Sequence, residues 1–319
     1  MKKIAMIGEY PASVMESFRS LSNGNFSIIE VHGYDEYDKL NDVDYIILRT
    51  LKMDRETIMK LGNVRLIHRW GAGYDTVDIK AAEERGISVA ITAGVNSWAV
   101  SELAVLLMLA VYRHLVDLDT QVKRGEWNRD IYLNDSHTIY GKTVGIVGCG
   151  NIGKKVAVKV QAFGARTVYF DTFRMPESTE KKLNLEFMKL DDLLAVSDIV
   201  SLHLPAIPET EGFVDDDFFR KMKRGSVLIN SARGSLIKED ALITALKSGQ
   251  LGGAGLDTIV KEPVLKDDPL LSCDNIVITP HIGAATIDIS STMVECVWNN
   301  IQEIEAGRQI KKPFLVSLT

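Results

Sequence analysis

Three residues in the second half of the chain have side chains suited to binding a carboxylate and moving a proton. Arg233 and His281 closely follow apolar runs that read as strands, and Glu262 precedes a proline in the loop between the last two such runs. Arginine binds carboxylates through parallel hydrogen bonds, histidine exchanges protons near neutral pH, and a neighbouring glutamate favours the charged imidazole. Singly, each could also be a surface ion pair, a solvated loop acid or a capping residue. Their shared position after predicted strands favours a common catalytic site.

A glycine-rich stretch upstream of these residues predicts a dinucleotide-binding site. The apolar run Val144 to Val147 ends in the pattern G-x-G-x-x-G, which leads into a segment with helical periodicity. The first glycine permits a tight turn, the second lets a pyrophosphate approach the backbone, and the third lets the helix pack close to the strand. Asp171 ends the next apolar run, where a carboxylate can accept both ribose hydroxyls of an adenosine. The glycines of the pattern are Gly148, Gly150 and Gly153.

Asp171 favours NAD as the cofactor, because a carboxylate at this position disfavours a 2′-phosphate. Arg174 stands three residues further on and could reach a phosphate, so NADP stays open as the less favoured alternative. Cys149 lies between two glycines of the pattern, where it is either a small filler residue or a thiol placed against the pyrophosphate.

A second glycine pair lies in the stretch Gly71-Ala72-Gly73, after the apolar run Leu66 to His68. Paired glycines can free backbone amides to converge on a small anion such as a substrate carboxylate. The same spacing also occurs in ordinary turns, which is the alternative. Trp70 and Trp98 add large apolar surface near the predicted substrate loops, and each either faces a substrate side chain or packs within its own domain.

The elements that would position these side chains alternate between strands and helices. Short apolar runs between segments of helical periodicity predict parallel sheets covered by helices, with ligands at the carboxyl ends of the strands. The predicted strands are Ile4 to Ile7, Ser27 to Val31, Tyr45 to Leu48, Leu66 to His68, Ser88 to Ala90, Val144 to Val147, Thr167 to Phe170, Ile199 to Leu204, Ser226 to Asn230, Ala254 to Leu256 and Asn275 to Ile278. The predicted helices include Leu190 to Val196, Asp216 to Met222 and Lys238 to Lys247.

A turn-rich stretch, Ala93 to Ser97, precedes a helix predicted from Val100 to Leu115. We place the crossing between two domains at this turn. The helix is apolar on nearly all sides and therefore needs cover all round, in the core of the second domain, in a subunit interface, or in both. Its apolar run, Leu103 to Tyr112, is about half as long as a bilayer span requires, which predicts a buried helix.

The composition limits the classes of partner. The chain has 319 residues and a formal net charge of −6, so it lacks the basic surface that nucleic acids or anionic membranes attract. Its cysteines are widely spaced without a C-x-x-C pattern, and its histidines form no H-E-x-x-H pattern. These features predict a reducing cytoplasmic location and no metal site. The apolar run after Met1 is too short for a secretion signal.

Taken in order along the chain, these motifs resemble the D-isomer-specific 2-hydroxyacid dehydrogenase family, and the resemblance covers nearly the whole chain. As a set they are highly specific. The motifs are Gly71-Ala72-Gly73-Tyr74-Asp75, Val147-Gly148-Cys149-Gly150-Asn151-Ile152-Gly153, His203-Leu204-Pro205, Asn230-Ser231-Ala232-Arg233-Gly234, Gly255-Leu256-Asp257, Glu262-Pro263 and Thr279-Pro280-His281-Ile282-Gly283.

The resemblance implies an α/β fold of two doubly wound parallel-sheet domains. A Rossmann NAD-binding domain, residues 99–285, is expected to be inserted into a flavodoxin-like substrate domain, residues 1–98 and 286–319. The family's catalytic residues fall on Arg233, Glu262 and His281, and its substrate contacts on Ala72, Gly73 and Arg233. Its cofactor contacts fall on Gly148, Gly150, Asn151, Ile152, Gly153, Asp171, His203, Pro205, Ser231, Ala232 and Asp257. The long helix resembles the family's dimer-forming element, so a homodimer is expected.

The implied reaction is reversible hydride transfer between NADH and C2 of a 2-keto acid, with His281 exchanging the proton on the oxygen. The chain has Leu51 where the phosphoglycerate branch is expected to carry a phosphate-binding arginine, which favours a non-phosphorylated substrate although Lys52 could compensate. The stretch Thr258 to Lys261 also departs from the family pattern. Phosphoglycerate dehydrogenase is one alternative. Another is an NAD(H)-sensing binding protein of the corepressor type, and formate or phosphite oxidation is a weaker one.

Overall fold

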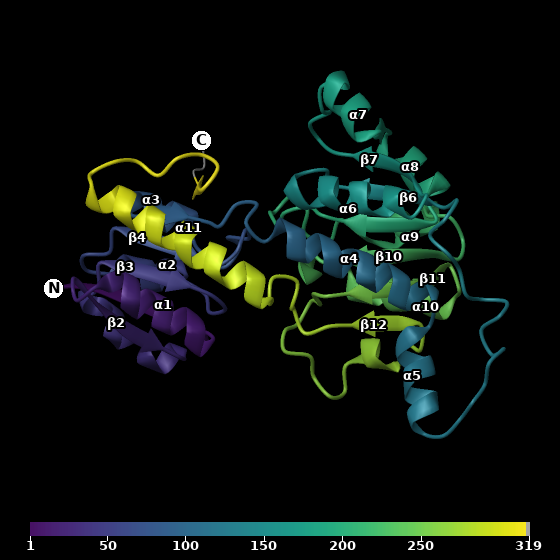
Figure 1. Cartoon of the computed structure of the whole chain (residues 1–319), viewed down its shortest axis with the longest axis horizontal. Coiled ribbons are helices and arrows are strands. Elements are labelled where there is room, and N and C mark those ends of the chain that lie inside the picture. The colour runs from purple at the N-terminus through teal and green to yellow at the C-terminus, as the bar shows by residue number, and fades with distance from the viewer. Residues whose placement is uncertain (317–319) are drawn as a thin grey trace. The chain divides into compact units, whose positions relative to one another are not determined.

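The computed structural model describes residues 1–316, which form two compact units. One unit consists of Met1–Asn96 together with the chain from Ala284 onward, and the other of Ser97–Gly283. Figure 1 labels most of the helices and many of the strands of the two units.

The first unit is a six-stranded sheet with the order β13-β5-β4-β3-β1-β2. All strands pair in parallel except β13, which pairs antiparallel with β5. The order β2-β1-β3-β4-β5 is that of flavodoxin-like sheets. The strands are β1 (Lys2–Ile7), β2 (Phe26–Val31), β3 (Tyr45–Leu48), β4 (Leu66–Arg69), β5 (Ser88–Ala90) and β13 (Leu315–Val316).

Both faces of this sheet are covered because side chains of a strand alternate between the two faces. In β1, Ile4 and Met6 join one apolar cluster with residues of α1 and α11. Ala5 and Ile7 join a second cluster with residues of α2 and α3. The helices are α1 (Ala12–Ser22), α2 (Arg55–Lys60), α3 (Ile79–Glu84) and α11 (Ile287–Glu305), with a 3-10 helix at Tyr34–Asp42.

The second unit is a seven-stranded parallel sheet with the order β12-β11-β10-β9-β6-β7-β8. The order of the strands reverses between β6 and β9, which is the Rossmann arrangement with its ligand-binding switch point at the carboxyl ends of these strands. The strands are β6 (Thr143–Val147), β7 (Arg166–Phe170), β8 (Glu186–Phe187), β9 (Ile199–Leu202), β10 (Ser226–Asn230), β11 (Leu251–Leu256) and β12 (Ile276–Ile278).

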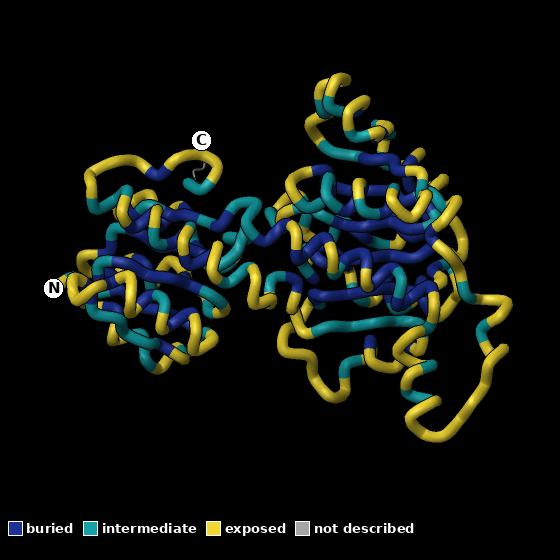
Figure 2. The backbone as a smooth tube through the Cα atoms, viewed as in Figure 1, coloured by how far each residue is buried: buried dark blue, intermediate teal, exposed yellow. Residues whose placement is uncertain are grey.

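Helices cover both faces of the second sheet as well. One apolar cluster contains residues of α4 and α6, and another contains residues of α8, α9 and α10. Figure 2 shows the central strands of both units as buried segments. The helices are α4 (Ser97–Tyr112), α5 (Leu115–Lys123), α6 (Asn151–Ala162), α7 (Glu177–Leu183), α8 (Leu190–Val196), α9 (Asp216–Lys221) and α10 (Glu239–Lys247).

The predicted fold class is confirmed, but the long apolar helix was predicted from Val100 to Leu115 and runs from Ser97 to Tyr112, so both ends were placed too late. It stops at Tyr112 because His114 adopts a left-handed conformation, with φ of 49°, and α5 begins after it. The predicted cover all round is incomplete in the single chain, since Trp98 and Leu106 are 59% and 53% exposed. Within residues 1–316 no single helix is long and apolar enough to span a membrane; α4 and α5 reach that length and composition only as a pair bent by 64°.

Candidate active site

The glycine loop follows β6 and has the geometry that its sequence predicts. Gly148 has φ of 91°, and a Cβ there would lie 2.7 Å from the carbonyl group of His203. A Cβ at Gly153 would lie 2.3 Å from the carbonyl oxygen of Gly148, so these two positions require glycine for packing. A Cβ at Gly150 would meet no atom within 4 Å, which leaves the backbone open to approach.

The loop also leaves amides unpaired at the start of α6. None of the N–H groups of Gly150, Asn151, Ile152 and Gly153 donates a hydrogen bond within the described residues. Free amides at the first turn of a helix bind anions, because they add to the positive end of the helix dipole. This open, amide-lined turn fits the pyrophosphate of a dinucleotide.

Asp171 lies beside the glycine loop at the end of β7. Its Oδ2 accepts a hydrogen bond of 2.8 Å from the amide of Cys149, so the carboxylate is fixed against the loop. The Cys149 side chain is buried in the core between α4 and α6, and burial raises the pKa of its thiol to about 12. This burial supports the interpretation of Cys149 as a small filler residue over that of a thiol placed against the pyrophosphate.

The guanidinium group of Arg174 is held by a carboxylate. Its Nε and Nη2 donate to the two oxygens of Glu180, both at 2.9 Å. Glu180 also accepts a hydrogen bond of 2.7 Å from the Tyr169 hydroxyl. The hydrogen bonds from Arg174 and Tyr169 lower the pKa of Glu180 to about 2, so the pair stays charged at neutral pH. This pairing opposes the use of Arg174 as a phosphate ligand.

Two polar atoms at the ends of β9 and β10 are buried without a partner among residues 1–316. His203 shares a hydrogen bond of 2.9 Å between Nε2 and Ser201, while its Nδ1 has no partner. Burial lowers the pKa of His203 to about 3, so the ring is neutral. The hydroxyl of Ser231 is the second such atom. Buried polar atoms without partners are costly, which fits a site that a polar ligand completes. Pro205, by contrast, is exposed.

The turn that carries Arg233 is fixed from both sides. The buried side chain of Asn230 accepts from the amide of Ala232 at 3.0 Å and donates to the carbonyl of Arg233 at 2.8 Å. A Cβ at Gly234 would lie 1.9 Å from the carbonyl group of Ile259, so only glycine fits there. The conformation of Arg233 is thereby set by its neighbours.

His281 and Glu262 form a pair. The imidazole Nδ1 lies 2.9 Å from Oε2 of Glu262, and the other carboxylate oxygen accepts from the amide of Ile259 at 3.3 Å. Burial raises the pKa of Glu262, but the hydrogen bond and charge of His281, the Ile259 amide and the charge of Arg233 together lower it. Nε2 of His281 has no partner within residues 1–316 and is available to a substrate. The pair can give or take a proton at that atom.

Asp257 fixes the turn that carries His281. Its side chain is 1% exposed and accepts from the amides of Ile282 and Gly283, each at 2.8 Å, and from the hydroxyl of Thr279 at 2.7 Å. Sequence reasoning assigned Asp257 only to the cofactor and missed this positioning role. The signal for it lies in the short spacing from Thr279 to Gly283, whose donors converge on one acid.

In the first unit, the predicted anion loop follows β4 and exposes its amides. The N–H groups of Gly71, Ala72, Gly73 and Tyr74 donate to no acceptor within residues 1–316. Four successive free amides are consistent with an anion-binding loop and unlike an ordinary hydrogen-bonded turn.

The two tryptophans differ in their surroundings. Trp70 packs edge-on against Tyr10, with ring centroids 5.5 Å apart, and against Phe18, which supports the packing alternative. Trp98 is mostly exposed, and the amino groups of Lys155 and Lys159 lie 5.2 and 4.3 Å from its ring centroid. Neither ring has the surroundings expected of a substrate-side wall within its own unit.

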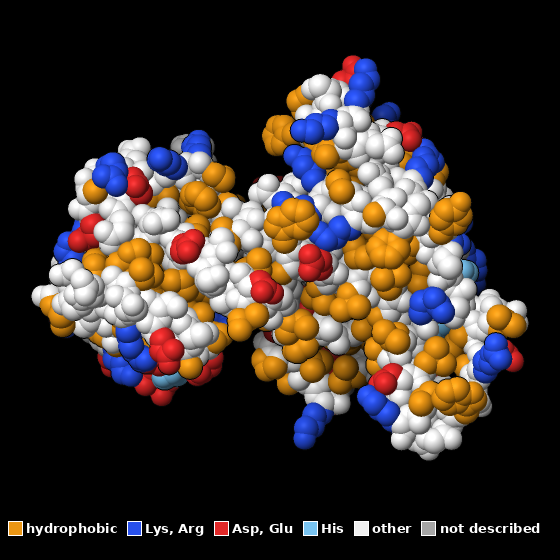
Figure 3. All heavy atoms as spheres, in the orientation of Figure 1, with side chains coloured by type: hydrophobic (Ala, Val, Ile, Leu, Met, Phe, Trp, Pro, Cys, Tyr) orange, Lys and Arg blue, Asp and Glu red, His pale blue; other side chains and the backbone are white. Residues whose placement is uncertain are grey.

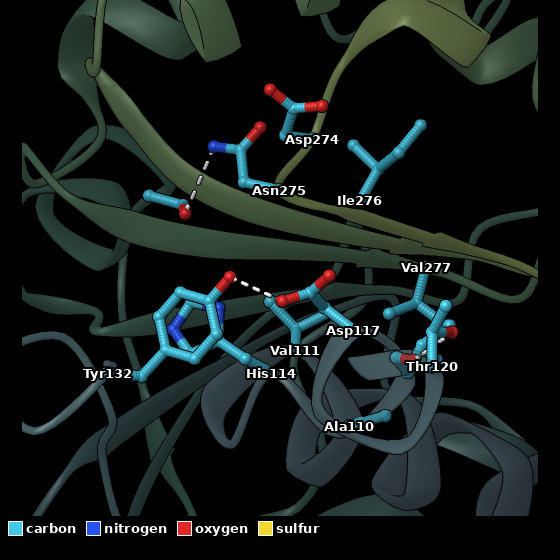
Figure 4. A pocket seen from close by; sticks show the side chains of 12 residues that line it. Ala110, Val111, His114, Asp117, Thr120, Tyr132, Asp274, Asn275, Ile276 and Val277 are labelled. Atoms are coloured by element: carbon cyan, nitrogen blue, oxygen red, sulfur yellow. Dashed lines mark hydrogen bonds between the residues drawn. The ribbon is translucent and has the colours of Figure 1, made fainter. Parts of the chain in front are cut away.

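A separate pocket of about 230 Å³ lies where α4, α5 and β12 meet (Figure 4). The ring of Tyr132 stacks on His114 at 3.9 Å, and its hydroxyl donates to Asp117 at 2.6 Å. Asp274 and Ile276 line another side. No predicted site residue lines this pocket, so its volume is not an argument for catalysis there.

Comparisons with known proteins found relatives that match most of the chain. Residues 105–283 match the family model described as D-isomer specific 2-hydroxyacid dehydrogenase, NAD binding domain. A glyoxylate reductase of Korarchaeum cryptofilum is 37% identical over 273 residues, which is 85% of this chain and 82% of that protein. A glyoxylate reductase structure from Paecilomyes thermophila has a TM-score of 0.85 and 31% identity, covering 99% of this chain and 98% of that one. An NAD-dependent formate dehydrogenase of Staphylococcus aureus in complex with NAD has a TM-score of 0.89 and 28% identity, covering 100% of each chain.

Proposed function

The chain belongs to the D-isomer specific 2-hydroxyacid dehydrogenase family, and from this premise we propose that it reduces a small, non-phosphorylated 2-keto acid of the glyoxylate type. It is an NAD-dependent oxidoreductase that transfers hydride reversibly between the nicotinamide and C2 of a 2-keto or D-2-hydroxy acid. The observation that carries the residue assignment is the hydrogen-bonded pair of His281 and Glu262, with Arg233 near enough to affect the charge of Glu262.

In this proposal, NADH supplies the hydride when it is bound. His281 gives a proton from Nε2 to the substrate oxygen, and Glu262 stabilises the charged imidazole. Arg233 and the amides of Ala72 and Gly73 hold the carboxylate and carbonyl groups, because a guanidinium and free N–H groups both donate to oxygen anions. The open turn at Gly150 accommodates the pyrophosphate. Residues 99–285 serve as the NAD-binding domain, and residues 1–98 and 286–319 as the substrate domain.

The preference for a small substrate without phosphate is supported by Leu51. This residue packs against the apolar cluster that contains residues of α2 and α3, where the phosphoglycerate branch is expected to carry an arginine. Lys52 is the other candidate for a phosphate; its backbone is held by the hydroxyls of Tyr34 and Tyr37, and its ammonium group has no partner within residues 1–316, so the preference rests on Leu51. The proposal therefore ranks glyoxylate and hydroxypyruvate above 3-phosphohydroxypyruvate.

A homodimer and a cytoplasmic location belong to the same proposal. Large apolar side chains are exposed on α4, on α5 and in the loop after them, including Leu106, Leu115 and Trp127, which is 81% exposed. Figure 3 shows hydrophobic side chains gathered over α4 and α5. Exposed apolar patches of this kind mark protein interfaces. The three cysteines carry free thiols, as expected in a reducing compartment. Sedimentation of Leu106→Asp tests the dimer, since a charge there should yield monomers.

A panel of keto acids tests the function. Oxidation of NADH and NADPH is followed with glyoxylate, hydroxypyruvate, pyruvate and 3-phosphohydroxypyruvate, in the wild type, His281→Ala and Arg233→Ala. We expect NADH-dependent turnover of the small keto acids, with large losses in both variants. Wild-type turnover in both variants would refute the roles. Tight NADH binding with no turnover of any substrate would instead favour a sensor of the corepressor type.

A further inference from the structure

Arg69 is a buried arginine at the last position of β4, directly before the free-amide loop. The residue is only 7% exposed to solvent. Nε donates to the carbonyl of Gly73 at 2.9 Å. Nη1 donates to the carbonyl of Leu48 at 2.9 Å and also to that of Arg49. One rigid guanidinium therefore ties the end of β3 to the loop that follows β4.

The contacts of Arg69 help to determine which backbone groups of the Gly71–Tyr74 loop are bonded within the protein and which are left free. The carbonyl of Gly71 accepts from the amide of Thr92 at 2.9 Å, and the carbonyl of Gly73 accepts from Arg69. Both carbonyls are thus engaged by protein donors, while the amides from Gly71 to Tyr74 have no acceptor within residues 1–316. A peptide whose oxygen is held on one side presents its N–H on the opposite side, because the peptide group is planar and trans. Holding the Gly73 carbonyl consequently orients the amide of Tyr74.

A second layer holds the backbone of Arg69 itself. Nδ1 of the buried His68 lies 2.9 Å from the carbonyl oxygen of Arg69, and Nε2 lies 3.0 Å from the side-chain amide nitrogen of Asn300 in α11. The contacts fit one arrangement, in which Nδ1–H donates to the carbonyl and Nε2 accepts from Asn300. Burial lowers the pKa of His68 to about 4, so this neutral form persists at neutral pH. Hydrogen bonds thus run from α11 through His68 to Arg69 and on to the loop.

We propose that Arg69 is a positioning residue for substrate binding: its guanidinium fixes the Gly71–Tyr74 loop so that the free amides bind the carboxylate of the 2-keto acid. This inference rests on the proposed function of the loop. Arg69 acts on the substrate through the loop, and His68 with Asn300 keeps the Arg69 backbone in place. The role predicts an effect on the KM of the keto acid and little effect on the KM of NADH.

Arg69→Met and Arg69→Lys in the full-length chain test the role. In Arg69→Met we expect the KM for glyoxylate to rise about tenfold or more, as the loss of charge-assisted hydrogen bonds implies, while the KM for NADH stays within about twofold. Lysine restores the charge but not the fork, so Arg69→Lys should recover part of the loss. Asn300→Ala should raise the same KM by a smaller factor, through His68.

Arg85→Met is a control, because Arg85 also donates to backbone carbonyls of the first unit, that of Met59 near the end of α2 and that of Gly62 after it, at 3.0 and 3.3 Å, although the residue is exposed. It should lower thermal stability without changing the KM for glyoxylate. A glyoxylate KM in folded Arg69→Met equal to that of the wild type would overturn the inference, as would equal effects of Arg69→Met and Arg85→Met on that KM. Folding is checked by circular dichroism, and Arg69→Lys and Asn300→Ala decide the matter if Arg69→Met does not fold.

Oxalate binding to the NADH complex, measured by calorimetry, separates this inference from the proposed function because it needs no turnover. Weaker oxalate binding in the Arg69 variants than in the wild type and Arg85→Met supports the positioning role, even if no keto acid is reduced. In that case only the proposed reaction fails. Oxalate affinity that is the same in the Arg69 variants and the wild type overturns the positioning role, whatever the activity.

Discussion

Replacing Glu262 with glutamine tests how the imidazole of His281 is kept charged. Glutamine has nearly the same shape and can still accept the hydrogen bond from Nδ1, which lies 2.9 Å from Oε2 of Glu262. The substitution therefore removes a negative charge and little else. Burial alone would raise the pKa of Glu262, but the interaction with His281 helps to lower it. Because the attraction between the two charges is mutual, Glu262→Gln also removes the attraction of the carboxylate for a positive charge on the ring.

The size of the effect follows from the separation of the charges. Two unit charges this far apart attract each other by roughly 1.4 kcal/mol at the dielectric constant of water. The side chains of His281 and Glu262 are 46% and 39% exposed, so the interaction is screened as at a protein surface. Since about 1.4 kcal/mol corresponds to one pH unit, Glu262→Gln should shift the pH profile of the reaction by about one unit.

Both pH profiles, that of keto-acid reduction and that of hydroxy-acid oxidation, should move to lower pH. At a fixed pH the rate of reduction should therefore fall and the rate of oxidation should rise. Keto-acid reduction needs the protonated imidazole, so activity is present at low pH and lost as the pH rises. Glu262→Gln should move this loss to lower pH, by about one unit. Hydroxy-acid oxidation needs the neutral imidazole, so the activity in this direction increases with pH. In Glu262→Gln this increase should also occur at lower pH. At a pH within the shifted range, reduction should fall by up to about tenfold while oxidation increases.

The assay is kcat/KM against pH in both directions for the wild type, Glu262→Gln and Glu262→Asp. Aspartate keeps the charge on a shorter side chain and serves as the control. Profiles of Glu262→Gln that coincide with those of the wild type would refute the electrostatic argument. An equal loss in both directions at every pH would assign Glu262 to holding the ring in place and not to charging it.

Three further tests, two of them with a control variant, have distinct expected outcomes. Glu180→Ala frees the guanidinium of Arg174 to bind the 2′-phosphate of NADPH. The ratio of kcat/KM with NADPH to kcat/KM with NADH should rise by about tenfold, as one added charged hydrogen bond would give. Arg174→Ala, the control, should leave this ratio unchanged. Gly153→Ala forces a Cβ to within 2.3 Å of a backbone oxygen and should lower both thermal stability and NADH affinity, whereas Gly150→Ala, with open space, should lower affinity alone. Asp257→Asn removes an acceptor from a buried turn and should lower the free energy of unfolding in urea by about 1–3 kcal/mol.

The parts of the fold that the sequence predicted are those encoded by local patterns. Predicted strands built on short apolar runs, such as Tyr45 to Leu48 and Ser226 to Asn230, coincide with β3 and β10, because a central parallel strand is buried on both faces. The glycine loop was predictable because Gly148 and Gly153 meet local steric demands that no other residue satisfies, while Gly150 leaves the backbone open. The neighbourhood of Glu262 and His281 was predictable because both follow ends of adjacent parallel strands.

Other features depended on contacts that no local pattern encodes. The strands β8 and β13 are two residues long and have too few side chains to show alternation. The break between α4 and α5 arises from the left-handed conformation of His114, and no glycine, proline or asparagine beside this residue signals a turn in the sequence. Cys149 and Arg174 were ambiguous in sequence because burial decides the first and the partner Glu180 decides the second.

The positioning residues that were not predicted from the sequence share one physical property. Asp257 and Arg69 are both buried charged side chains that bind backbone groups of a turn following a strand. Their partners, the amide of Ile282 and the carbonyl of Gly73, become neighbours only when the strands are in register. A residue that reacts with the substrate must contact it, so its role can be predicted from its residue type and its position at the end of a strand. A positioning residue is identified by the backbone atoms it binds, which only the folded chain brings together. The two kinds should therefore separate in kinetics, since substitutions at the first change the proton step and substitutions at the second change substrate affinity or stability first.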